Sequence, residues 1–152
     1  MRGVTLIEMM VVVMVIALVV SISTPSVAAG IDAVRLATAC SSVASFLNAA
    51  ATRAERRQRP VELIVSAPDN SLRFVSTDAG SYRELKLPEG IVLEGVLGAA
   101  GEDPESARRW LFVPGGTVPG IGIRLANRHG GHRIVRLDPM TGFPRVERVE
   151  KK

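Results

Sequence analysis

Glu8 is an ionisable side chain inside a long apolar run near the start of the chain. Every residue in 9–20 is apolar, and the wider run 4–22 contains only two other polar residues. An unpaired charge in hydrocarbon costs about 3 kcal/mol or more, so a carboxylate in such a position usually has a partner or a function. The chemistry that Glu8 could perform is therefore ion pairing in apolar surroundings.

No other group of residues has a spacing typical of an enzyme or a metal site. His129 and His132 flank two glycines, and together with the single cysteine, Cys40, they make no zinc-like pattern. No glycine-rich phosphate loop precedes a helical segment, and no serine lies in a nucleophile elbow. We therefore expect no catalysis, cofactor or metal, and we interpret His129 and His132 as turn residues and Cys40 as a small buried residue.

Basic residues gather in the C-terminal part of the chain. The formal net charge is +4, and from Ser106 to the end ten Lys and Arg residues stand against three acidic ones. Such a cluster can bind phosphates or an acidic partner, and the candidates for contact with DNA or a partner protein are Arg133, Arg136, Arg145 and Arg148. Arginines at alternate strand positions also fit a solvated sheet face, and Phe143 is the one aromatic side chain nearby for stacking.

The apolar run 4–22 has the length of a membrane span. Its 19 residues would extend close to the thickness of a bilayer's hydrocarbon layer as a helix. An ordinary secretory signal cleaved near Ser21-Ile22-Ser23 and a plain single-span anchor are two interpretations, but neither accounts for Glu8. Arg2 precedes the run, so the positive-inside rule places the N-terminus in the cytoplasm and exports the remainder.

The string Gly3-Val4-Thr5-Leu6-Ile7-Glu8, followed by the apolar run, resembles the class III signal of type IV prepilins and pseudopilins. The resemblance implies that a prepilin peptidase cuts after Gly3 and methylates the new N-terminus at Val4, where the family usually has Phe. It also implies that Glu8 pairs with the N-terminal amine of a neighbouring filament subunit. Further implied partners are other pseudopilins and an inner-membrane assembly platform.

One long helix is predicted for about residues 4–59. Apolar residues recur at steps of three and four beyond the first run and predict a stripe that packs on a sheet: Leu36, Cys40, Val43, Leu47, Ala50 and Ala54. Pro60 ends the pattern. Pilin-like subunits often carry a proline just after the apolar run, so we interpret Pro25 as a kink in this helix rather than a stop.

The remainder predicts eight short strands, which indicates an α+β fold with a long N-terminal transmembrane helix packed on a small antiparallel two-sheet β head. Turn signals such as Asp78-Ala79-Gly80 and an acidic loop over 98–107 separate the strands. The predicted strands are 61–65, 71–75, 82–87, 91–97, 110–113, 122–125, 132–137 and 143–149. The predicted organisation is a leader (1–3), a transmembrane or filament-core half-helix (4–24), an amphipathic half-helix (25–59) and a β-rich periplasmic head (60–152).

This layout resembles the GspH/FimT family of minor pseudopilins, in which Thr-Gly, here Thr141-Gly142, usually precedes an arginine-rich last strand. The resemblance implies a structural subunit of the type II secretion pseudopilus, a single-pass protein of the bacterial inner membrane whose head lies in the periplasm. The alternative is a FimT-like minor pilin that contacts DNA in natural competence. Those relatives carry Gly-Arg-X-Arg, and here only Arg145 of Gly142-Phe143-Pro144-Arg145 matches. A third interpretation is a secreted β protein with an ordinary signal.

Overall fold

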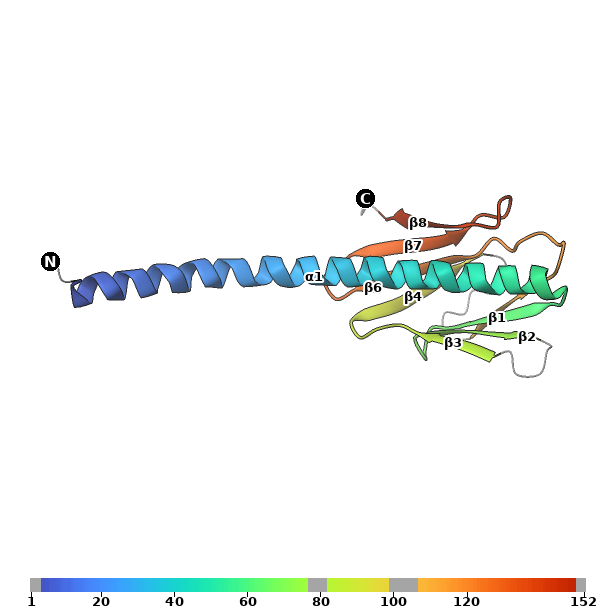
Figure 1. Ribbon diagram of the computed structural model, residues 1–152, viewed down its shortest axis with the longest axis horizontal. Helices are drawn as coiled ribbons and strands as arrows, with labels where there is room; N and C mark the ends of the chain where they lie inside the picture. Colours follow the sequence, from blue (N-terminus) through green and yellow to red (C-terminus); the bar gives the residue numbers. More distant parts are fainter. Residues whose placement is uncertain (1–3, 77–81, 99–106, 150–152) are drawn as a thin grey trace.

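A single long helix begins the chain and extends well beyond the rest of the molecule (Figure 1). The computed structural model describes residues 4–76, 82–98 and 107–149, with the backbone alone described for 22–29. Helix α1 (Leu6–Arg57) has 52 residues and is therefore roughly 78 Å long. Gly3, the predicted turn at Asp78-Ala79-Gly80 and most of the predicted acidic loop lie outside the described residues.

The ends of α1 have identifiable caps. The hydroxyl of Thr5 accepts a hydrogen bond from the backbone N–H of Glu8 at 3.4 Å, which satisfies one of the free donors of the first turn. At the other end Gln58 adopts a left-handed conformation (φ 52°), and its N–H bonds to the carbonyl oxygens of Ala54 and Glu55. The helix is thus two residues shorter at each end than predicted.

Pro25 lies inside this helix and does not end it, because α1 continues to Arg57. The alternative that Pro25 simply ends the helix, which we did not favour, is therefore excluded. The kink that we expect at this residue stays a prediction.

The head consists of eight strands in two antiparallel sheets of four. One sheet has the strand order β3-β2-β1-β5 and the other β4-β6-β7-β8. The strands are β1 (Val61–Ser66), β2 (Ser71–Ser76), β3 (Tyr82–Lys86), β4 (Ile91–Leu97), β5 (Arg108–Phe112), β6 (Gly122–Asn127), β7 (His132–Leu137) and β8 (Pro144–Arg148). In the described part of the chain the eight predicted strands are confirmed, and β4 and β7 have the predicted bounds.

The two sheets share one core with the second half of α1. The helix lies across both sheets, with β7 and β8 on one side of it and β1, β2 and β3 on the other (Figure 1). The predicted stripe is confirmed, since all six of its side chains are buried against residues from both sheets. Phe46 of α1 and Phe74 of β2 add an aromatic contact with ring centroids 5.0 Å apart. The helix therefore organises the head as well as extending from it.

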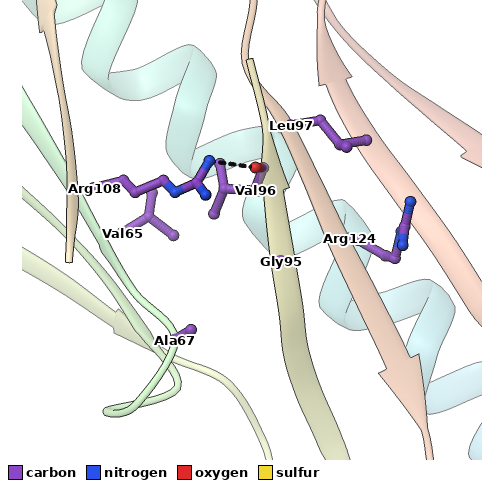
Figure 2. Close-up of a pocket in the computed structure, with 7 residues that line it drawn as sticks. All are labelled: Val65, Ala67, Gly95, Val96, Leu97, Arg108 and Arg124. Atoms are coloured by element: carbon purple, nitrogen blue, oxygen red, sulfur yellow. Dashed lines mark hydrogen bonds between the residues drawn. The ribbon is translucent and has the colours of Figure 1, made fainter. Parts of the chain in front are cut away.

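Two polar contacts join the sheets directly. Asn70, in the β1–β2 turn, has a left-handed backbone with φ 49°. Its side-chain amide nitrogen donates a hydrogen bond to the carbonyl oxygen of Ile91 at 2.8 Å, and its side-chain oxygen accepts one from the N–H of Leu93 at 2.9 Å. Arg108 at the start of β5 donates to the carbonyl of Val96 in β4 at 2.7 Å, as Figure 2 shows beside a pocket of about 110 Å³. Both contacts hold β4 against the first sheet.

We expect Asn70→Ala to lower the free energy of unfolding by about 1–3 kcal/mol. The change removes both side-chain hydrogen bonds to β4, and alanine is less tolerant than asparagine of a left-handed backbone. Urea unfolding of the full chain in detergent measures the effect. Asn48→Ala, at an exposed position of α1, is the matched control and should change stability by less than about 0.5 kcal/mol. Equal stability of the two variants would contradict the proposed link.

Candidate functional site

The first half of α1 exposes an apolar surface. Its large apolar side chains from Val4 to Val20 are 43–79 % exposed, and this part of the helix extends away from the head (Figure 1). Burying apolar surface is worth roughly 25 cal/mol per Å², so a surface of this extent strongly favours a cover of lipid or of other protein. The segment therefore has the character of an interaction surface rather than of a helix that functions alone in water.

Glu8 lies at the start of this surface, in the first turn of α1. There its carboxylate is favourably placed for the positive end of the helix dipole. Within the described residues no cation forms an ion pair with Glu8, whose side chain is exposed. Val4 precedes it by four residues, which is about one helical turn. Among the described residues, the carboxylate of Glu8 is therefore available to a cation.

The position of the N-terminal half relative to a membrane stays a prediction. Within the described part of the chain, no helix meets the combined requirements of length and hydropathy for a membrane span.

The four C-terminal arginines lie on two opposite faces of the second sheet. Strand register pairs Arg133 with Arg148 and Arg136 with Arg145, and directly paired residues point to the same face. Arg133 is two residues from buried Val135 in β7, so the two side chains point to the same face, which is the one that meets the helix. Arg133 and Arg148 therefore lie on this inner face, and Arg136 and Arg145 lie on the outer face. The structure therefore does not bring the four arginines together into one patch.

The outer pair of arginines has carboxylates nearby. Arg136 Nε lies 3.8 Å from a carboxylate oxygen of Glu147, and a guanidinium nitrogen of Arg145 lies 3.6 Å from one of Asp138. Arg136, Glu147 and Arg145 are substantially exposed, so each ion pair contributes little to stability. They do reduce the local positive charge available to a phosphate.

The turn between β7 and β8 is organised by Asp138. Its side chain accepts hydrogen bonds from the N–H groups of Met140 at 2.9 Å and Thr141 at 3.3 Å, and Gly142 supplies a positive φ of 71°. The Met140 bond above all, with the Thr141 bonds and the charge of Arg145, lowers the pKa of Asp138 below its ordinary value. Arg145, the residue that matches the DNA-binding string, thus lies beside the carboxylate that forms this turn.

Both histidines connect separate elements of the fold. Nδ1 of His129, in the β6–β7 turn, lies 2.8 Å from a carboxylate oxygen of Asp32 on α1, and Nδ1 of His132 lies 2.9 Å from one of Glu94 on β4. The interpretation of His132 as a turn residue is wrong, because it begins β7. Neither contact could be predicted from spacing, since the partners are 97 and 38 residues away. Among the described residues, no group of three or more His, Cys, Asp or Glu side chains could hold a metal.

Comparisons with known proteins support the fold assignment. No family model matches the chain, and no curated protein matches it significantly. Among solved structures it is similar to the minor pseudopilin EpsH from the Type 2 Secretion System of Vibrio cholerae, with a TM-score of 0.56 and 12 % sequence identity over 75 % of this chain and 97 % of that chain. The chain therefore has the α+β fold of a minor pseudopilin, as the resemblance of its sequence to the GspH/FimT family predicted.

Proposed function

We propose that this chain is a GspH-type minor pseudopilin, a structural subunit of the type II secretion pseudopilus that takes part in protein export across the outer membrane. The observation that carries the proposal is the exposed apolar half of α1, with Glu8 in its first turn, attached to a head of pseudopilin fold. A helical polymer needs such a surface, because its subunits pack through their apolar helices.

In this proposal the chain has two successive environments. Residues 4–24 first hold it in the bacterial inner membrane as a single-pass protein, with the N-terminus in the cytoplasm and the head in the periplasm. A prepilin peptidase removes residues 1–3. The assembly platform then transfers the chain into the filament, where the helices of other pseudopilins replace lipid as the apolar cover.

Glu8 has a defined role in this transfer. Cleavage after Gly3 creates a free amine on Val4, about one helical turn from Glu8. A carboxylate and an amine from neighbouring subunits can neutralise each other inside the helix bundle, which removes much of the cost of an unpaired charge in apolar surroundings. The pair forms only when neighbours have the correct axial offset, so it favours one register.

The FimT-like alternative, a minor pilin that contacts DNA, is less well supported. Its candidate arginines lie on two faces of the second sheet, and Arg145 lies beside Asp138. A continuous phosphate-binding surface made of these four residues is therefore not present.

We expect the mature chain, isolated from the membrane fraction of a bacterium that contains prepilin peptidase, to begin at Val4. Mass spectrometry of the intact protein and of its N-terminal peptide measures this directly and also reports methylation. A strain without the peptidase is the control and should retain Met1. A mature N-terminus near Ser23 would instead identify an ordinary secretory signal and exclude the proposed function.

A further inference from the structure

A groove of about 500 Å³ lined by arginines lies between α1 and the β2–β3 part of the first sheet. Nine residues line it: Ser45, Asn48, Ala49, Thr52, Arg53, Arg56 and Arg57 of α1, Phe74 of β2, and Arg83 of β3. Four of the nine are arginines and none is acidic. This concentration of one charge is unrelated to the C-terminal arginines considered above.

The helix supplies one wall of the groove. The seven lining residues of α1 follow one another at alternating steps of three and one, from Ser45 to Arg57, and form a single stripe beside the buried apolar stripe of the helix. Arginines three and four positions apart repel each other and weaken a helix by roughly 0.2–0.5 kcal/mol per pair, although the helix dipole favours cations in the last turn. The nearest acidic residue on the helix, Glu55, instead accepts a hydrogen bond from the N–H of Gly115 at 2.9 Å.

Arg83 supplies the opposite wall. It pairs with Phe74, whose side chain is 2 % exposed in the core, so Arg83 points toward the helix side of the sheet. An inward-pointing charge on an edge strand such as β3 can simply prevent edge-to-edge association. That role explains a charged residue at position 83. It does not explain why Arg83 lines the same groove as three arginines of α1.

Three of the groove arginines are available to bind an anion. Within the described part of the chain, no carboxylate forms an ion pair with Arg56, Arg57 or Arg83, and all three side chains are exposed. A guanidinium can bind a carboxylate through two parallel hydrogen bonds. An anionic ligand in the groove would therefore relieve the repulsion between the walls and gain several charged hydrogen bonds.

We propose that this groove binds an acidic peptide segment of another protein, whose carboxylates bridge Arg56 and Arg57 on α1 and Arg83 on β3. Ser45, Asn48 and Thr52 add neutral polar groups along the wall, which suit the backbone of an extended peptide. Phe74, the aromatic residue of the groove, is buried and presents no face on which a nucleic-acid base could stack. The inference concerns the head, and it stands or falls separately from the processing and assembly of the N-terminal segment.

The test uses the full chain in a non-ionic detergent and a short fluorescent peptide of alternating Glu and Gly. We expect fluorescence anisotropy to show binding that weakens as salt is added, because the contacts are between exposed charges. The triple variant Arg56→Gln, Arg57→Gln and Arg83→Gln should weaken binding by roughly tenfold or more, which corresponds to the loss of one or two charged hydrogen bonds. Arg83→Gln alone should give part of this loss.

Two controls make the result specific. The variant Arg109→Gln, Arg145→Gln and Arg148→Gln removes the same charge outside the groove and should bind the peptide nearly as the unmodified chain does. Urea unfolding establishes that both triple variants are folded. The proposal is overturned if the two variants lose affinity equally, if no binding is measurable at low salt, or if a duplex DNA probe binds the groove more tightly than the acidic peptide.

Discussion

Glu8→Leu should abolish incorporation of the chain into filaments while the chain remains in the membrane. The substitution makes the first turn of α1 more apolar, so lipid should hold the chain at least as well as before. It also removes the carboxylate that would neutralise the amine of a neighbouring Val4. An uncompensated ammonium inside a helix bundle would cost several kcal/mol, which is enough to lower incorporation more than a hundredfold. Immunoblotting of sheared filaments measures how much of the chain is incorporated, and immunoblotting of washed membranes measures how much remains in the membrane.

Two further variants separate charge from shape at this position. Glu8→Gln keeps the size and polarity of the side chain but not its charge, and it should fail to assemble as Glu8→Leu does. Met9→Leu changes the neighbouring apolar residue without touching the ion pair, and it should assemble normally. Normal assembly of Glu8→Leu would show that Glu8 does not direct incorporation, and the proposed assembly mechanism would be wrong.

Leu47→Ala should destabilise the head by about 2–5 kcal/mol, which is the usual cost of removing a large core side chain that cannot be replaced by neighbouring atoms. Leu47 is 0 % exposed and lies in the middle of the stripe through which α1 contacts the head. A small domain has only about 5–15 kcal/mol of total stability, so the loss would be a large share of it. Urea unfolding followed by the fluorescence of the single tryptophan, Trp110, which is buried in the same core, reports the change.

Val34→Ala is the matched control for this core substitution. Val34 lies on the same helix but is 65 % exposed, so truncating it removes little packing, and alanine is the better helix former. We expect a change of less than about 0.5 kcal/mol. Similar losses at Leu47 and Val34 would mean that the stripe of α1 does not hold the head together.

The features that depend on local periodicity could be predicted from the sequence. The stripe from Leu36 to Ala54 has helical spacing, and burial of all six side chains follows from it. Alternation and turn residues were sufficient to place β4 and β7. The start of β5 was missed by two residues, because Arg108 and Arg109 are unremarkable locally and become part of a strand only by pairing with Val65 and Ile64 of β1.

The features that depend on distant pairing could not be predicted in this way. Arg136 and Arg145 share a face only because of the register between β7 and β8, as do Arg133 and Arg148. The spacing of three residues within each strand puts the two pairs on opposite faces. The arginine groove was missed for the same reason. Arg83 follows the helix arginines by more than twenty residues, and nothing in its neighbours along the chain indicates that it faces them.

The burial of Cys40 has a consequence for how this protein can be joined to others. It is the single cysteine of the chain, its side chain is fully buried in the core, and burial raises the pKa of its thiol despite the opposing charge of Arg133. Oxidation therefore cannot cross-link the folded chain to a copy of itself or to a partner. No attachment of the folded protein to a partner therefore depends on a disulfide, so an assembly containing it can be dismantled and its subunits reused without any reductant.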